Sequence, residues 1–179
     1  MNGSLPGQTL VDFDGRLINM SDRKSISDSP ITVGWREWIS LPDLDVPAVK
    51  AKFDTGARTS SLHTFLIEPY EDGGKSMVRF GVHPLQRRDD VAIICHAEVV
   101  DRRWTTDSGG GREKRYVIGT TISMAGRKWP IELNLTNRED LRFRFLVGRT
   151  TMEGMIIVDP LRSYVLGRKL GKSYPPKKA

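Results

Sequence analysis

Apolar and polar residues alternate along most of this chain, a pattern that predicts strands with one buried face. In residues 46–53, apolar Val49, Ala51 and Phe53 alternate with lysines. The alternation is strongest in the second half of the chain, at residues 116–124, 131–135 and 141–147. Further short strands are expected at residues 31–41, 62–67, 76–83, 91–100 and 156–158.

Helical spacing is nearly absent from the sequence. Only residues 149–155 predict a short helix. Turn signals separate the expected strands, among them Leu41-Pro42-Asp43, Glu71-Asp72-Gly73-Gly74 and Ala125-Gly126-Arg127. Many short strands joined by turns predict an all-β fold, as a barrel or a sandwich.

The two ends of the chain lack this periodicity. Residues 1–30 are rich in Ser, Asp, Gly and Asn, which predicts a disordered leader. Residues 168–179 are basic and end in Pro175-Pro176-Lys177-Lys178, which predicts a disordered tail. Residues 31–167 are left as one domain, a length that suffices for a single hydrophobic core.

The net charge of +6 comes largely from the tail. Residues 168–179 hold five Lys or Arg and no acid, whereas residues 1–30 hold three Lys or Arg and four acids. The remaining 20 basic and 18 acidic residues leave the body at only +2. Nucleic-acid binders more often carry a basic stripe on the folded face. A ribosome- or RNA-associated β-barrel that binds through its tail is therefore the weaker alternative.

The composition also bears on location. No apolar run approaches the roughly 20 residues of a membrane helix, so no membrane association is expected. Residues 1–30 lack the apolar centre of a signal peptide. Cys95 is the single cysteine, which excludes an internal disulfide. Together these features predict a cytoplasmic protein.

The candidate chemistry begins with Asp54-Thr55-Gly56, directly after the strand expected at residues 46–53. Asp and Gly after a strand indicate a turn. A carboxylate held in a rigid turn is a candidate for acid–base catalysis. The same triplet is common in ordinary turns, so taken alone it leaves both interpretations open.

Three motifs in order resemble the retropepsin-like aspartic proteases. The first is Asp54-Thr55-Gly56-Ala57 after an apolar strand, and the last is Leu146-Val147-Gly148-Arg149. Between them, Asp107 to Gly111 lies where that family has its glycine-rich hairpin, the flap. The resemblance implies an acid-protease closed barrel with one lobe per chain, and it implies that Asp54 is catalytic.

The fuller pattern is similar to one bacterial family, commonly labelled ATP-dependent zinc proteases. Its members are associated with the ligase that adds glutamates to a small-subunit ribosomal protein. The matching residues are Phe53 to Ser60, Trp129 and Glu132, Leu146 to Arg149, and Val158-Asp159-Pro160. The resemblance covers residues 31–167. It implies a peptide or protein substrate, with the glutamate ligase or the ribosomal protein as a partner.

The zinc and ATP of that label have no counterpart in the sequence. A His-Glu-x-x-His helix is absent, and His63, His83 and His96 fall on separate elements. The segment Gly167 to Ser173 is one residue short of a phosphate loop, and Pro175-Pro176 follows it where a helix would be needed. We therefore expect no metal and no nucleotide cofactor.

Peptide hydrolysis by carboxylates needs two of them sharing one proton. Because the chain has one Asp-Thr-Gly in the right context, the resemblance implies a homodimer in which Asp54 comes from each subunit. Thr55 would bond across the twofold axis, Gly56 would allow close backbone approach, and Ala57 would favour activity nearer neutral pH. Gly109, Gly110 and Gly111 would let the flap open and close.

Two further points stay open in the sequence. Asp107-Ser108-Gly109 could pair with Asp54 within one chain, although each half is then small for a lobe. Arg58, Arg112 and Arg115 could lie near the cleft and favour acidic peptides, or they could be solvated surface residues. The alternative to a protease is a binding module that partners the glutamate ligase with little hydrolysis of its own.

Overall fold

The computed structural model describes residues 9–11, 17–19, 29–106, 110–137 and 143–176. Within these residues the regular structure is almost entirely β-strand, with one α-helix, α1 (Arg149–Met152). The all-β class and the short helix predicted from the sequence are confirmed. No helix of the described part is long and apolar enough to cross a membrane.

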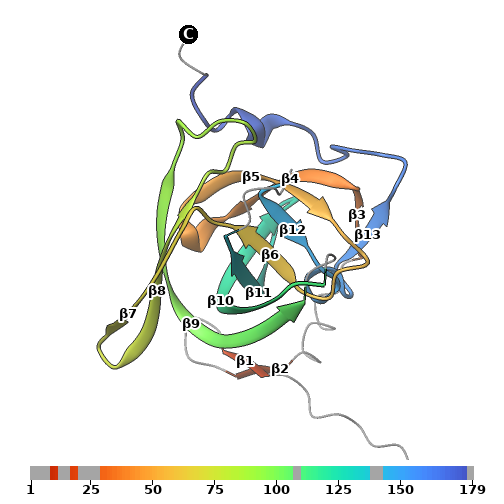
Figure 1. Cartoon of the computed structure of the whole chain (residues 1–179). Helices are drawn as coiled ribbons and strands as arrows, with labels where there is room; N and C mark the ends of the chain where they lie inside the picture. Colours follow the sequence, from red (N-terminus) through yellow and green to blue (C-terminus); the bar gives the residue numbers. More distant parts are fainter. Residues whose placement is uncertain (1–8, 12–16, 20–28, 107–109, 138–142, 177–179) are drawn as a thin grey trace, which may run out of the picture.

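Figure 1 shows the strands, coloured in the order of the chain. They are β1 (Thr9–Val11), β2 (Leu17–Asn19), β3 (Ile31–Gly34), β4 (Arg36–Leu41), β5 (Val46–Phe53), β6 (Ser60–His63), β7 (Leu66–Asp72), β8 (Lys75–Val82), β9 (Ile93–Thr106), β10 (Arg112–Met124), β11 (Arg127–Thr136), β12 (Phe145–Val147) and β13 (Ile156–Asp159). Two 3-10 helices, η2 (Pro42–Leu44) and η3 (Lys169–Lys172), complete the regular elements.

One large sheet organises the domain, in the order β11-β6-β12-β5-β4-β10-β9-β8-β7. Because β10 also pairs with β11, the strands from β11 to β10 close into a ring. The hairpin of β7 and β8 continues the sheet beyond that ring and projects away from it (Figure 1). Short β12 lies between β5, to which it is parallel, and β6, to which it is antiparallel. This arrangement places the end of β5 against the segment that follows β12.

The alternation seen in the sequence is the alternation of burial in the structure. On β5, Val49 and Ala51 are fully buried and Phe53 is 4% exposed, whereas the intervening lysines are partly exposed. Phe80 and Phe145 are the largest side chains buried completely within the same core. Burial of one face of each strand supplies the main stabilisation of such a fold.

The end of the chain differs from the disordered tail that we predicted. Residues 168–176 pack against the sheet: the Tyr174 hydroxyl donates to the Ala48 carbonyl at 2.6 Å, and Gly171 lies against the ring of Trp38. Just before this segment, fully buried Glu37 accepts a hydrogen bond from the Val165 amide at 2.7 Å. The prediction of a disordered tail rested on its high charge and proline content. Composition of this kind gives no information on contacts with residues far away in the sequence.

The predicted leader is described only in part. Within residues 1–30 the structure describes the antiparallel pair β1 and β2 and residues 29–30. The rest of the leader, and residues 177–179 of the tail, lie outside the described residues.

Candidate active site

Asp54 begins the loop that joins β5 to β6. Its backbone amide donates to the Val147 carbonyl at 2.9 Å, which extends the parallel pairing of β5 with β12 by one residue. Its carbonyl accepts from the Ala57 amide at 3.2 Å, which closes the predicted turn. The strand therefore holds the backbone of Asp54 on one side and the turn holds it on the other.

The carboxylate of Asp54 is oriented by its own loop. The Gly56 amide donates to Asp54 Oδ1 at 3.0 Å, and Lys52 Nζ lies 3.4 Å from Asp54 Oδ2. The Asp54 side chain keeps 30% of its surface exposed. A carboxylate that is fixed on one side and open on the other can meet a substrate or a second subunit.

The structure brings the second predicted motif, Leu146 to Arg149, to this loop. Arg149 donates from Nη1 to the Thr55 carbonyl at 2.9 Å and to the Gly56 carbonyl at 3.2 Å. Gly148 packs so closely that an added Cβ would lie 2.4 Å from the carbonyl carbon of Thr59. The two motifs, far apart in sequence, thus form one backbone cradle.

Buried hydroxyl groups behind this cradle were not predicted. Ser60 Oγ accepts a hydrogen bond from the Gly148 amide at 3.0 Å and lies 2.7 Å from Thr151 Oγ1. Trp129 Nε1 donates to the Thr151 carbonyl at 3.1 Å. Thr151 lies within the expected helix at residues 149–155, Ser60 precedes the strand expected at residues 62–67, and no local pattern marks the two as partners.

Strands β9 and β10 pair on either side of the segment predicted as the flap, residues 107–111. The pairing extends out to Thr106 and Arg112, and Gly110 adopts a positive φ of 83°, which suits a glycine at a tight turn. Gly111 is described, whereas all three residues of Asp107-Ser108-Gly109 lie outside the described residues. The pairing of this triplet with Asp54 within one chain therefore stays a prediction.

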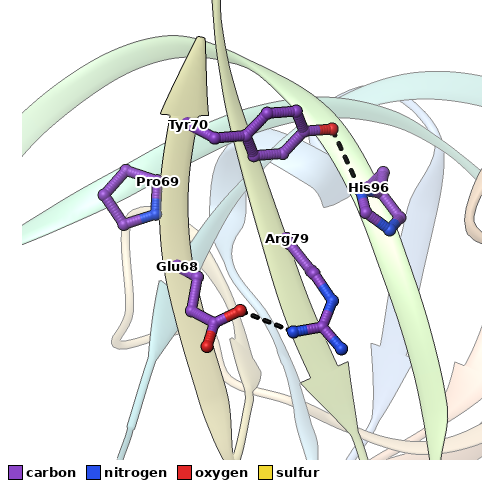
Figure 2. Close-up of a pocket in the computed structure, with 5 residues that line it drawn as sticks. All are labelled: Glu68, Pro69, Tyr70, Arg79 and His96. Atoms are coloured by element: carbon purple, nitrogen blue, oxygen red, sulfur yellow. Dashed lines mark hydrogen bonds and ion pairs between the residues drawn. The ribbon is translucent and has the colours of Figure 1, made fainter. Parts of the chain in front are cut away.

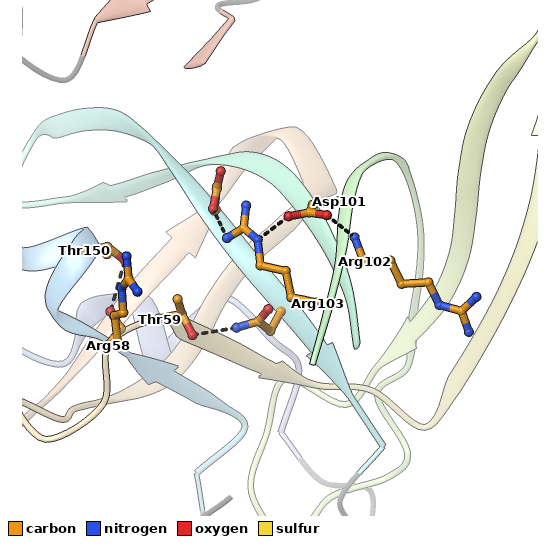
Figure 3. A network of polar contacts seen from close by, with 8 residues as sticks. Arg58, Thr59, Asp101, Arg102, Arg103 and Thr150 are labelled. Atoms are coloured by element: carbon orange, nitrogen blue, oxygen red, sulfur yellow. Dashed lines mark hydrogen bonds and ion pairs between the residues drawn. The ribbon is translucent and has the colours of Figure 1, made fainter. Parts of the chain in front are cut away.

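The structure does not gather the three predicted substrate-binding arginines at one point. Arg58 is exposed on the Asp54 loop, where its carbonyl accepts from Thr150 Oγ1 at 3.2 Å (Figure 3). The guanidinium of Arg112 lies 5.5 Å from the centre of the Trp104 ring. Arg115, only 8% exposed, forms an ion pair with Glu113. Because strand residues alternate between faces, Arg112 and Arg115 lie on opposite faces of the hairpin.

A second charged group on the hairpin was missed by the sequence reasoning. Arg103 pairs with Asp101 on its own strand, and its Nη1 lies 2.5 Å from Glu132 Oε2 on β11 (Figure 3). The hydrogen bond that Arg103 donates to Glu132 raises the pKa of Arg103, and the hydrogen bond that Arg103 donates to Asp101 lowers the pKa of Asp101. The i, i+2 spacing of Asp101 and Arg103 on a long strand was the available signal.

Other candidate chemistry lies apart from this loop. Among the described residues, no group of three or more His, Cys, Asp or Glu side chains could hold a metal ion. Cys95 is buried, and burial raises the pKa of its thiol to about 12. A shallow pocket on the projecting sheet is lined by Glu68, Pro69, Tyr70, Arg79 and His96 (Figure 2). There Tyr70 bonds to His96 and Arg79 to Glu68, so these polar groups satisfy each other.

Comparison with protein families gives one match over most of the chain. Residues 32–169 match the model of the RimB-like family, described as retropepsin-like aspartic endopeptidase RimB. The match includes Asp54, strands β9 and β10, and the Leu146 to Arg149 motif.

Relatives found by sequence are longer proteins. The chain is 44% identical over 144 residues to a probable alpha-L-glutamate ligase of Shewanella pealeana, covering 80% of this chain and 31% of that protein. It is 44% identical over 137 residues to a probable alpha-L-glutamate ligase of Parasynechococcus marenigrum, covering 76% of this chain and 29% of that protein. The chain thus spans about a third of the length of these relatives.

A solved structure shares the fold. The protein Lpg0085 of Legionella pneumophila, of unknown function, superimposes with a TM-score of 0.64 at 27% identity. The superposition covers 77% of this chain and 99% of that one.

Proposed function

This chain belongs to the RimB-like family of retropepsin-like aspartic endopeptidases, and we propose that it hydrolyses peptide bonds with Asp54 as its catalytic residue. The observation that carries the proposal is the geometry of one carboxylate. Asp54 Oδ1 is fixed by the Gly56 amide at 3.0 Å, while the side chain stays 30% exposed. The group is therefore preorganised and accessible, as a catalytic carboxylate must be.

The active site needs a second carboxylate, and we propose that a second copy of the chain supplies it. Two carboxylates in contact share one proton because both cannot ionise at close range. The ionised member accepts a proton from a water molecule, which attacks the scissile carbonyl carbon. The protonated member donates to the carbonyl oxygen, which gives a tetrahedral gem-diol. The C–N bond then breaks as the carboxyl group that took the proton of the water gives it to the leaving amine, and the other carboxylate takes a proton back from a gem-diol hydroxyl. The pair titrates as a unit, so its pH profile belongs to both residues.

The residues around Asp54 support this arrangement. Thr55 and Gly56 are exposed, and their carbonyls are held by Arg149 at 2.9 and 3.2 Å. The exposed Thr55 side chain would bond across a twofold axis. Ala57, next to them, is half-buried and adds no polar group to the dyad. A loop that is rigid before assembly loses little conformational entropy when two subunits meet.

We propose that the substrate lies extended between the Asp54 loop and the β9–β10 flap, where it adds β-type hydrogen bonds. The relatives named as probable alpha-L-glutamate ligases point to an acidic substrate. The candidate is a protein tail of glutamates, such as that of the glutamate-modified ribosomal protein. The ligase would be a functional partner, the compartment would be the cytoplasm, and neither metal nor nucleotide would be required.

The decisive experiment compares wild type with Asp54→Asn on a glutamate-tailed peptide and on a neutral peptide, each with and without a metal chelator. We expect Asp54→Asn to abolish cleavage and the chelator to have no effect. Loss of activity with chelator, combined with retained activity in Asp54→Asn, would overturn the assignment. Equal cleavage of the two peptides would remove the acidic substrate and leave the protease.

A binding module that partners a ligase is the second candidate. The observation in its favour is that the matched segment forms 31% of a longer ligase in the Shewanella relative. In that case Asp54→Asn would bind peptides and ligase as wild type does, and wild type would show no turnover.

A further inference from the structure

Two arginines face each other across the β9–β10 hairpin. Arg103 on β9 and Arg115 on β10 are direct cross-strand partners, so their side chains share one face of the hairpin. Like charges directly opposite each other destabilise a sheet unless carboxylates compensate them. The two arginines differ in the number of carboxylates that compensate their charge.

Arg103 is fully engaged, whereas Arg115 is not. Arg103 has Asp101 on one side and Glu132 on the other. Arg115 has a single partner, since its Nε donates to Glu113 Oε1. No described residue accepts a hydrogen bond from the terminal amino groups of Arg115. Arg115 as a whole is only 8% exposed, but its terminal amino groups are not fully buried. The charged end of the side chain therefore reaches solvent.

The face that carries Arg115 continues to the Asp54 loop. Thr136 Oγ1 on β11 donates to Glu113 Oε1 at 3.2 Å, which ties the ion pair to β11. On the same face of β11, Asn134 Nδ2 donates to Thr59 Oγ1 at 2.7 Å. Thr59 belongs to the loop that follows Asp54. Figure 3 shows the Thr59 and Arg103 contacts of this face in one view.

We propose that Arg115 is a specificity-determining residue that binds a carboxylate side chain of the substrate, and that Glu113 competes with the substrate for it. The inference rests on the proposed function, because it places the peptide under the flap. The free edge of the guanidinium offers two N–H donors in a planar fork that matches a carboxylate. Glu113 holds Arg115 in place while the site is empty, and a substrate carboxylate takes its place or shares the fork.

This competition predicts opposite effects for the two members of one ion pair. Loss of Arg115 removes the binding group and lowers the preference for acidic peptides. Neutralisation of Glu113 removes the competitor and raises that preference. A purely structural ion pair behaves differently, since loss of either member then weakens the flap in the same direction.

The experiment measures binding in the Asp54→Asn background, so that it needs no turnover. Fluorescence anisotropy gives the Kd of a peptide with a glutamate tail and of its glutamine-tailed counterpart. We expect Asp54→Asn to prefer the glutamate peptide by about tenfold, which corresponds to one charge-assisted hydrogen bond. The preference is the Kd of the glutamine peptide divided by the Kd of the glutamate peptide. Adding Arg115→Met should bring this ratio near one, and adding Glu113→Gln should raise it about threefold. Arg79→Met is the matched control and should leave the ratio unchanged, because Arg79 pairs with Glu68 on the projecting β7–β8 hairpin.

Ratios that move in the same direction in the two variants, or that do not move, would overturn the proposal. If Arg115→Met does not fold, Arg115→Lys replaces it, since a lysine keeps the charge but lacks the planar fork and should reduce the ratio. Failure of the proposed function has a different signature. Wild type would then cleave neither peptide, while the binding ratios could still follow the predicted order.

Discussion

Lys52 Nζ lies 3.4 Å from Asp54 Oδ2, so the candidate catalytic carboxylate has a counter-ion from its own strand. In one subunit this pair adds little stability, because the Lys52 and Asp54 side chains are 42% and 30% exposed. In the proposed dimer its role differs. Two Asp54 carboxylates would approach each other, and each Lys52 would offset part of their repulsion.

The first prediction concerns this lysine. Lys52→Met should change the free energy of unfolding of the subunit by less than about 1 kcal/mol. It should weaken dimerisation, because the lysine then no longer offsets the negative charge at the facing carboxylates, and the loss should shrink at high salt, which screens exposed charges. Sedimentation equilibrium at low and high salt measures the effect. Lys50→Met is the control, because Lys50 Nζ bonds instead to Gln86 Oε1 at 2.7 Å. Equal dimerisation of the two variants would contradict the role of Lys52.

The second prediction concerns the contact between the two motifs. A Cβ on Gly148 would lie 2.4 Å from the carbonyl carbon of Thr59, and backbone cannot rotate away as a side chain can. Gly148→Ala should therefore destabilise the fold by about 1–3 kcal/mol, as overpacking does, and displace the Asp54 loop. Thermal unfolding measures it. Gly119→Ala is the control, since its Cβ would meet only Val100 Cγ1, at an ordinary 3.8 Å. A Gly148→Ala variant as stable as Gly119→Ala would contradict this packing.

Much of the fold could be read from the sequence because its signals are local. The alternation around Val49, Ala51 and Phe53 reports burial on one face, and the structure buries that face. The resemblance singled out the Asp54 motif and the Leu146 to Arg149 motif, and the hydrogen bonds of Arg149 to the loop carbonyls show that the fold brings them together.

The parts that could not be predicted depend on contacts between distant residues. The packing of Tyr174 on Ala48 and the buried bond between Ser60 and Thr151 leave no local pattern. Hydrogen bonding between strands also extends some strands beyond the ends that alternation predicts. The sequence predicted that one strand ends at residue 100, whereas β9 continues to Thr106. The flap arginines show the same limit: alternation places Arg112 and Arg115 on opposite faces, but their partners come from the fold.

The third prediction uses the single cysteine as a probe of the core. Burial raises the pKa of the Cys95 thiol to about 12, and only the thiolate reacts rapidly with alkylating reagents. Native protein at pH 8 should therefore resist iodoacetamide, whereas protein unfolded in guanidinium chloride should react fully. Mass spectrometry counts the modified chains. Rapid labelling of native protein would show that the core around Cys95 opens.

The fourth prediction concerns the ordered end of the chain. The Tyr174 hydroxyl donates to the Ala48 carbonyl at 2.6 Å, and loss of such a bond in Tyr174→Phe should cost about 1 kcal/mol of unfolding free energy near pH 7. Burial raises the pKa of Tyr174 above its ordinary value of 10.0. A group whose pKa is raised by folding contributes fully below its unfolded pKa, and the contribution is lost as the pH rises through the folded pKa.

The difference between wild type and Tyr174→Phe should therefore be constant from neutral pH to about pH 9 and shrink above about pH 10. Urea unfolding at a series of pH values measures it. Tyr70→Phe is the control, because the Tyr70 hydroxyl bonds to His96 at the exposed surface and its loss leaves no buried group unpaired. A difference that persists undiminished into strong alkali would mean that it does not come from the hydrogen bond of the half-buried Tyr174 phenol to Ala48. The segment would then be held by Gly171 against Trp38, and Gly171→Ala, whose Cβ would lie 2.8 Å from that ring, should release it.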